Sequence, residues 1–147
     1  MKKLSILLVL ALAAALLFTA CSGGNIEIQD GTYRAEYADY DQHGYKDYVV
    51  ITFEDGAVAS IEADGVAEDG SLKSASAEYR EKMESVQGTY PEKYYKDLIN
   101  QYLENPDADA IDVVAGATST SNSFITLLKA LEKNVRTGDT KTVIVNR

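Results

Sequence analysis

The stretch that decides the fold covers residues 45–63, YKDYVVITFEDGAVASIEA. Its first half, up to Phe53, is rich in β-branched and aromatic residues, which favour β-strands. Asp55-Gly56 follows, and Asp-Gly between two runs of this kind is a strong signal for a tight hairpin turn. Residues 57–63 then supply the returning partner, so the stretch predicts two antiparallel strands.

A further strand is predicted upstream of the hairpin. Tyr33, Ala35 and Tyr37 alternate with their neighbours, and this period of two is typical of a strand. A polar loop at residues 39–44 separates the segment from the hairpin. The first third of the folded chain is therefore expected to be an antiparallel meander.

Three helices are expected after an acidic loop at residues 64–70. Apolar residues then recur at helical spacing on three segments, which end at Gly88, at Asn105-Pro106 and near residue 134. Thr89 is expected to cap the second helix, and the third starts near residue 120. The expected buried positions are Leu72, Ala75, Tyr79, Met83 and Val86 on the first helix, Tyr94, Tyr95, Leu98, Ile99 and Tyr102 on the second, and Phe124, Leu127, Leu128, Leu131 and Val135 on the third.

A last strand is predicted at residues 141–146, after the Gly138 that follows the third helix. The order of elements is then three strands, two helices, a loop, a helix and a strand. This order predicts an α+β fold, in which an antiparallel sheet, made of the N-terminal meander plus the C-terminal strand, carries about three helices on one face.

The N-terminus has the pattern of a lipoprotein export signal. A short basic start precedes an apolar run over residues 4–18, which is short for a bilayer-spanning helix. Cys21 is the only cysteine, so we expect it to carry a lipid rather than a disulfide, although Phe18 stands where Leu is usual. The expected organisation is a signal peptide at residues 1–20, a lipidated Cys21 with a flexible tether at residues 21–29, and one domain at residues 30–147.

The net charge argues against nucleic acid as a partner. The whole chain carries −9, and removal of residues 1–20, which hold two lysines and no acidic residue, makes the charge −11. Phosphate backbones are bound by clustered Lys and Arg, and a chain this acidic is poorly suited to that role. Anionic headgroups also repel it, so the lipid on Cys21 is expected to hold the protein on the extracytoplasmic side of the cell membrane.

Small residues and hydroxyls gather at residues 112–122, DVVAGATSTSN, as nowhere else in the chain. Gly116, between two alanines, is expected to leave the backbone uncovered so that a bulky group can approach it. The hydroxyl run lies where the third helix begins, and the free N–H groups of a helix start favour an anion. From the residues alone two interpretations stay open, an N-cap made by residues 118–121 or an anion site.

This stretch resembles the attachment motif of the FMN-binding domain. That domain is found in the C subunit of the Na⁺-translocating NADH:quinone reductase, in the G subunit of the Rnf complex and in small extracytoplasmic flavin lipoproteins. The family's motif runs Asp, two variable residues, Ser or Thr, Gly, Ala and Thr. Asp112, Gly116, Ala117 and Thr118 match it, and Ala115 departs from it. The resemblance extends over residues 30–134.

The resemblance implies that FMN is bound, either covalently, with its phosphate joined to Thr118 by a flavin transferase, or without a covalent bond. It implies an electron carrier rather than an enzyme, with a membrane redox protein or another flavoprotein as partner. The alternatives are a flavin-free lipoprotein with a ligand-binding or structural role, and an accessory subunit of a membrane redox complex. The expected cofactor-binding residues are Asp112, Gly116, Ala117, Thr118, Ser119, Thr120 and Ser121.

The aromatic residues are ten tyrosines and three phenylalanines, with no tryptophan. Tyr33, Tyr37 and Tyr48 lie on predicted strands and are the first candidates for stacking on a flavin ring. No metal site is expected. The loop at residues 107–118 begins like a calcium loop but has no Gly at its sixth position and no Glu at its twelfth. His43 has no second His and no Cys nearby to share a transition metal with.

Overall fold

The computed structural model describes residues 27–147, and the predicted signal peptide and the lipidated Cys21 lie outside the described residues. Within this part of the chain, three helices and a four-stranded, mostly antiparallel sheet confirm the predicted fold class. The elements are, in order, β1 (Gly31–Tyr37), β2 (Tyr45–Glu54), β3 (Ala57–Ala67), the 3-10 turn η1 (Lys73–Ala75), α1 (Ala77–Gln87), α2 (Pro91–Glu104), the 3-10 turn η2 (Ala108–Ala110), α3 (Thr118–Thr137) and β4 (Val143–Val145).

The predicted hairpin and meander are both present. β2 pairs antiparallel with β1 and with β3, and the described strands lie in the order β3-β2-β1-β4. Asp55 and Gly56 have positive φ angles of 52° and 72°, as a two-residue type I′ turn requires. The Asp30 carboxylate accepts hydrogen bonds from both of their amides, at 3.0 and 2.9 Å, and so ties the start of β1 to this turn.

β3 continues to Ala67, whereas the sequence predicts a loop from residue 64. Asp64 and Gly65 are both buried there. The Asp64 carboxylate accepts hydrogen bonds from the amide of Gly65 at 2.7 Å, from the amide of Ser74 at 3.1 Å and from the Ser74 hydroxyl. A residue type that usually favours loops is therefore satisfied inside the strand by the segment that follows it.

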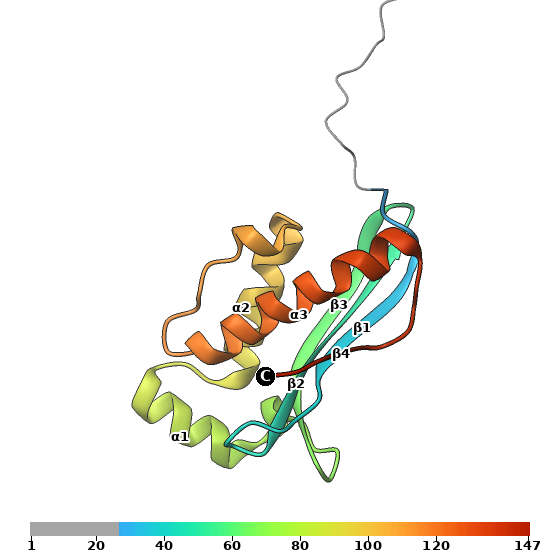
Figure 1. Ribbon diagram of the computed structural model, residues 1–147. Helices are drawn as coiled ribbons and strands as arrows, with labels where there is room; N and C mark the ends of the chain where they lie inside the picture. The colour runs from blue at the N-terminus through green and yellow to red at the C-terminus, as the bar shows by residue number, and fades with distance from the viewer. Residues whose placement is uncertain (1–26) are drawn as a thin grey trace, which may run out of the picture.

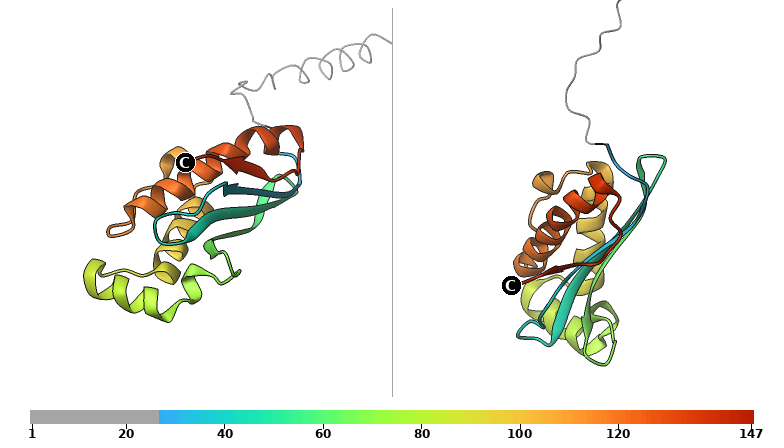
Figure 2. Two further views of the ribbon diagram at one scale, coloured as in Figure 1. Left: turned by 60° about the horizontal axis from the view of Figure 1, so that its bottom comes forward. Right: turned by 45° about the vertical axis from the view of Figure 1, so that its right-hand side comes forward.

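Helices α2 and α3 cover one face of the sheet (Figures 1 and 2). α3 packs on β1 and β2, and α2 packs on β3. The apolar stripes predicted for these two helices are confirmed, apart from Ile99, which is half-buried. The largest fully buried side chains between the layers are Tyr33, Val49, Ile51, Tyr94, Leu98, Phe124, Leu127 and Leu131.

The helix predicted from Leu72 starts later and has a different surface. The Ser76 hydroxyl accepts a hydrogen bond from the Tyr79 amide at 3.2 Å, so α1 begins only at Ala77, after η1. No residue of α1 is buried, and Val86 is 72 % exposed, so the predicted apolar stripe is wrong as a core-facing stripe. Within α1, Tyr79 and Met83 are the only half-buried residues.

The start of β1 lies at the C-terminal end of α3 (Figure 1). The Gln29 amide donates to the Val135 carbonyl oxygen at 3.0 Å. Gly138 ends α3 with a φ of 70°, and β4 then pairs in parallel with β1, where the sequence predicts antiparallel pairing throughout. None of the helices within residues 27–147 is both long enough and apolar enough to cross a membrane.

Candidate functional site

Residues 112–117 form a tight loop ahead of α3, and Ser121 closes this loop. The Ser121 hydroxyl donates to the Ala117 carbonyl oxygen at 2.9 Å and accepts from the Val114 amide at 3.0 Å. The Ala117 amide donates to the Val114 carbonyl oxygen at 3.0 Å. Ser121 is fully buried, so its contribution to the site is to fix the loop from inside.

Gly116 packs the loop against the end of α1. Its φ is +79°, and a Cβ on it would lie 2.7 Å from the Gln87 carbonyl oxygen and 3.1 Å from Cγ2 of Thr89. The sequence suggests that the missing side chain leaves room for a ligand. This expectation is corrected, because the connection from α1 to α2 occupies that space. The glycine is therefore needed for the close packing of this loop against the end of α1.

The first turn of α3 has no side-chain cap. Its N-cap residue is Ala117, which has no hydroxyl, and no acidic residue follows in the first turn. The amides of Thr118, Ser119 and Thr120 have no acceptor among residues 27–147. The interpretation of residues 118–121 as an N-cap is therefore wrong. The start of this twenty-residue helix instead presents free N–H groups and the positive end of a helix dipole.

The hydroxyls of this turn differ in exposure. Thr118 and Ser119 are exposed, as is Ala115 in the loop before them. Thr120 is buried and points toward α2, where it lies beside the Tyr94 hydroxyl. Two accessible hydroxyls thus accompany three free amides, which is an arrangement that suits a phosphate.

Two buried hydroxyls beside the motif lack a hydrogen-bond partner. They are Oγ1 of Thr89 and the hydroxyl of Tyr94, and no acceptor or donor among the described residues has the geometry to bond them. Burial raises the pKa of Tyr94 above its usual value. Buried hydroxyls normally have a hydrogen-bond partner, so these two leave hydrogen-bonding capacity unused next to the motif. The sequence predicts that Thr89 caps α2 and that Tyr94 is buried. The cap is wrong, because the N-cap of α2 is Tyr90 and no side chain caps this helix, whereas the burial of Tyr94 is confirmed.

Asp112 holds the other end of the loop to α2 through its backbone. Its amide donates to Oε1 of Gln101 at 2.8 Å, and its carbonyl oxygen accepts from Nε2 of the same side chain at 3.2 Å. The Asp112 side chain is exposed. The loop is therefore fixed on three sides, by Gln101, Gln87 and Ser121.

A cluster of buried ionisable residues extends from this site into the sheet. The Tyr95 hydroxyl donates to Oδ1 of Asp47 at 3.1 Å, and burial together with the Asp47 charge raises the pKa of Tyr95. Burial also raises the pKa of Asp64, against the effect of its hydrogen bonds from Ser74 and Gly65. Lys73 is buried in the same region. The cluster combines carboxylates, tyrosines and one ammonium near the start of α2.

The three tyrosines singled out on the strands are not open to a ligand. The buried Tyr33 hydroxyl donates to the Gln29 carbonyl oxygen at 2.8 Å. Tyr37 is buried beneath the Arg147 guanidinium, whose Cζ lies 4.1 Å from its ring centroid. Tyr48 is buried, its hydroxyl donates to Glu62, and burial followed by this bond raises its pKa. Stacking on a flavin ring is therefore not their role in this conformation.

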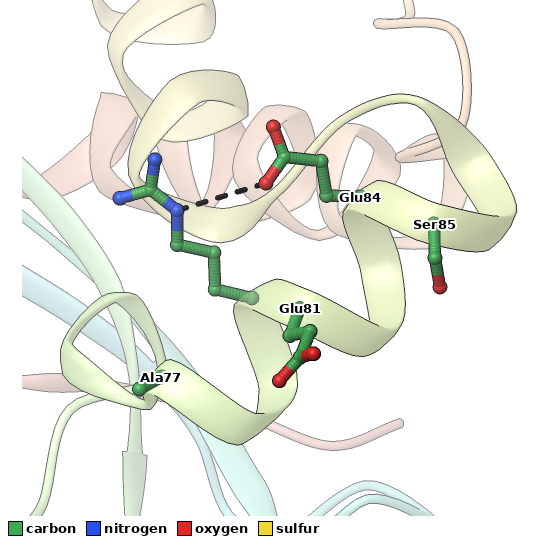
Figure 3. A pocket seen from close by; sticks show the side chains of 5 residues that line it. Ala77, Glu81, Glu84 and Ser85 are labelled. Carbon is green, nitrogen blue, oxygen red and sulfur yellow. Dashed lines mark ion pairs between the residues drawn. The ribbon is translucent and has the colours of Figure 1, made fainter.

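Two hollows lie away from the motif. The first is a shallow depression along one face of α1, where an exposed ion pair joins Nε of Arg80 to Oε2 of Glu84 at 3.9 Å (Figure 3). The second, of about 820 Å³, lies at the C-terminal end of α3, between that helix, the β2–β3 hairpin and η2. Ile28, Phe53, Leu103, Leu131 and Val135 are among its apolar lining residues. Neither hollow contains a residue of the 112–122 stretch.

The fold defines a small α+β domain, and the start of α3 is its candidate anion site. The comparison with protein families makes the class specific. The chain belongs to the FMN-binding domain family, whose sequence model matches residues 44–132. FMN is the cofactor of this domain, and the motif at residues 112–118 lies inside the matched region.

Individual relatives agree with this membership. The 15 kDa lipoprotein of Treponema pallidum is 38 % identical over 134 residues, which cover 91 % of this chain and 94 % of that protein. A Clostridium perfringens protein of known crystal structure is 35 % identical with a TM-score of 0.77, covering 82 % of this chain and 98 % of the other. A Clostridium thermocellum protein solved by NMR shares the fold, with a TM-score of 0.50 and 24 % identity over 72 % of this chain and 92 % of its own.

The residues at the start of α3 fit the phosphate end of FMN. An uncapped helix start supplies donors for phosphate oxygens, and Thr118 supplies an exposed hydroxyl. The unpartnered hydroxyls of Thr89 and Tyr94 lie beside the same loop and can bond a polar group or an ordered water there. When bound, the flavin supplies the redox chemistry, and the protein supplies its position and electrostatics.

Proposed function

We propose that this protein is an extracytoplasmic, membrane-anchored electron carrier whose FMN is joined through its phosphate to Thr118. The observation that carries the proposal is the uncapped start of α3, where three free amides accompany an exposed threonine hydroxyl. The amides and the helix dipole stabilise the phosphate charge. A covalent bond keeps the cofactor with a protein that works outside the cytoplasm.

Thr118 is the proposed acceptor because it holds the place of the threonine that ends the family's motif. Its side chain is exposed, as is that of Ser119, whereas Thr120 and Ser121 are buried and the Ser121 hydroxyl is bonded on both sides. The linkage requires an activated flavin nucleotide that contains a pyrophosphate. Oγ of Thr118 bonds to the phosphorus on the flavin side, the other nucleotide leaves with the bridging oxygen, and the hydroxyl proton passes to the flavin transferase.

The test is to produce the exported protein in a host that contains a flavin transferase and to look for flavin fluorescence after denaturing electrophoresis. We expect the parent protein and Thr118→Ser to fluoresce, and Thr118→Ala to be dark. Thr126→Ala is the matched control, since it removes an exposed hydroxyl of α3 outside the motif, and it should fluoresce like the parent. Fluorescence retained in Thr118→Ala would rule out the covalent assignment, and a native protein without any flavin would rule out the electron carrier.

A lipid on Cys21 is proposed as the membrane anchor. The similarity to the Treponema pallidum protein, which is named a lipoprotein and aligns over 91 % of this chain, supports it. Feeding labelled fatty acid to the producing cells should label the parent protein and leave Cys21→Ser unlabelled and released from the membrane fraction. Labelled Cys21→Ser would overturn this anchor. The proposed partners are the flavin transferase and a membrane redox protein or another flavoprotein.

A further inference from the structure

The hollow of about 820 Å³ at the C-terminal end of α3 has the size and lining of a ligand pocket. Phe53, Leu131 and Val135 belong to its walls, and each of these side chains is at most 8 % exposed. Leu103 also lines the hollow and is 50 % exposed, so the recess is open to solvent on the side of α2. Pockets of about 300–1,000 Å³ with mostly apolar walls are the usual sites of small ligands. The hollow therefore has room for a hydrocarbon chain.

The charged side chains at the hollow disfavour an anionic ligand. Asp107, Asp109 and Glu132 supply three carboxylates, whereas Arg136 supplies the one guanidinium among the described lining residues. That guanidinium already pairs with Glu132, since its Nη2 lies 3.6 Å from Oε2 of the carboxylate. A fatty acid carboxylate or an anionic phospholipid headgroup would meet net negative charge there. The ligand that fits is apolar and has no negative charge at its polar end.

The described chain starts at the wall of this hollow. Ile28 is one of the lining residues, and the amide of Gln29 donates to the carbonyl oxygen of Val135, another lining residue, at 3.0 Å. Asp30 then accepts from two amides of the β2–β3 turn, one of which belongs to Gly56, which also lines the hollow. The segment is thus fixed to α3 and to the hairpin at once (Figure 1). A group attached shortly before Ile28 is consequently held beside the hollow.

Cys21, the proposed site of lipid attachment, precedes Ile28 by seven residues. A stretch of that length reaches at most about 25 Å when it is extended. A short linker raises the effective concentration of what it carries to about millimolar, which favours a tethered acyl chain over a free lipid. A diacylglyceryl group joined to the cysteine sulfur carries no charge, so the carboxylates at the hollow do not oppose it. The protein's own anchor is therefore the ligand that best meets these conditions.

We propose that the hollow at the end of α3 binds one acyl chain of the lipid on Cys21. This inference rests on the proposed lipid anchor, not on the flavin, and gives the anchor a second point of attachment. Lipid tails and apolar side chains are similar surroundings for a hydrocarbon chain, so one chain lies in the hollow while another stays in the bilayer. Binding fixes the orientation of α3, with its C-terminal end toward the membrane and Thr118 away from it.

The test is photocrosslinking from the lipid of the intact lipidated protein. Producing cells are fed palmitic acid that carries a diazirine near its methyl end, and the purified protein is placed in phosphatidylcholine nanodiscs at one copy per disc. After irradiation, mass spectrometry of the peptides locates the cross-links. We expect them in the peptides that contain Phe53, Leu103 or Leu131. Cross-links to phospholipid alone would overturn the proposal.

Two blocking variants and one control test the hollow itself. Val58→Trp enlarges a half-buried lining side chain and should abolish the cross-links. Val86→Trp makes the same change at an exposed position of α1, outside the hollow, and should keep them. Leu103→Glu places a carboxylate at an exposed lining position, where folding tolerates it, and should also abolish them. Cross-links that persist in both blocking variants would contradict binding in the hollow.

The remaining outcomes separate the anchor from its binding site. A parent protein that takes up no labelled fatty acid overturns the anchor on Cys21 and this inference with it, whereas labelled protein without cross-links to the hollow overturns the inference alone. Cys21→Ser is incubated with an equimolar amount of the same free fatty acid, and we expect no cross-link. Cross-linking equal to that of the parent would reveal a site for free fatty acids and overturn the tethered ligand. None of these readouts requires flavin, so the carrier function is tested separately.

Discussion

The Gln87 carbonyl oxygen lies 2.7 Å from the point that a Cβ on Gly116 would occupy. The neighbour is a backbone atom at the end of a helix, so it cannot rotate away as the tip of a side chain can. The positive φ of 79° at Gly116 is a second, independent requirement for glycine. The flavin motif is therefore fitted to α1 as well as to α3.

Gly116→Ala should lower the free energy of unfolding by about 3 kcal/mol, the sum of backbone strain and overpacking. Gly44→Ala is the matched control, because Gly44 has a φ of +83° but no atom within 4 Å of the added Cβ. Gly44→Ala should lower the free energy of unfolding by only about 1 kcal/mol. Urea unfolding of the flavin-free proteins measures both values. Equal losses would show that the Gln87 contact is unimportant.

Ser121 and Ser119 should respond differently to the same substitution. Ser121→Ala leaves the half-buried Val114 amide without its acceptor and should lower the free energy of unfolding by about 1 kcal/mol. Ser119→Ala removes an exposed hydroxyl and should change it by less than about 0.5 kcal/mol. Thermal unfolding of the two variants gives the comparison, and a neutral Ser121→Ala would contradict the proposed closure of the loop.

Thr89→Val should raise the stability of the flavin-free protein by about 1 kcal/mol. The substitution keeps the shape of the side chain and removes a buried hydroxyl that has no partner among the described residues. Thr126→Val, at an exposed position of α3, is the control for the change of residue type. A destabilised Thr89→Val would mean that an ordered water satisfies the hydroxyl.

Stability should depend on pH through Asp64. Burial raises the pKa of this carboxyl above 3.8 in the folded protein, so its contribution is fully present below 3.8 and is lost as the pH rises through the folded pKa. Asp64→Asn does not titrate and can keep the bonds to Ser74 and Gly65. It should therefore gain stability relative to the parent between about pH 4 and about pH 7 in urea unfolding.

Asp69 should change the pH dependence of stability in the opposite direction from Asp64. Hydrogen bonds from the Ser71 hydroxyl and amide lower the pKa of Asp69, so its contribution is present at neutral pH and is lost as the pH falls through the lowered pKa. Asp69→Asn should lose stability relative to the parent as the pH rises. A common slope for both variants would contradict the assignment of these two carboxyls.

Elements with strong local signals could be predicted from the sequence. Asp55-Gly56 between two strand-forming runs specifies its turn by itself, and the stripe from Phe124 to Val135 specifies the buried face of α3. The helix α1 was predicted, but its buried stripe was wrong. Helical spacing does not tell how much of a stripe a neighbouring layer covers, and here only Tyr79 and Met83 are half-buried while Val86 is exposed. The parallel pairing of β4 with β1 depends on how α3 crosses the sheet, which no local pattern encodes.

The position of the motif at the start of a helix was predicted from the sequence, and α3 does begin at Thr118. The binding role of its residues stays a prediction. Thr118 and Ser119 are exposed hydroxyls at a helix start, as the hydroxyl run suggests. The structural roles of Ser121 and Gly116 could not be predicted. Ser121 bonds the loop before its own helix, and Gly116 contacts Gln87 and Thr89, which are distant in the sequence and adjacent in the fold. The burial of Lys73 gave no signal in the sequence, because a lysine in a polar stretch normally faces solvent.

The length of α3 also sets the distance between the proposed flavin site and the start of the described chain. Its first residue is Thr118, and the Val135 carbonyl near its other end bonds Gln29, where the described chain begins. The 17 residues that separate Thr118 from Val135 span about 26 Å along the helix. With an anchor at Cys21, a further eight residues at most about 28 Å long precede Gln29. A flavin at Thr118 would then lie at most about 54 Å from the proposed anchor. The proposed flavin site and the proposed membrane anchor therefore lie at opposite ends of α3.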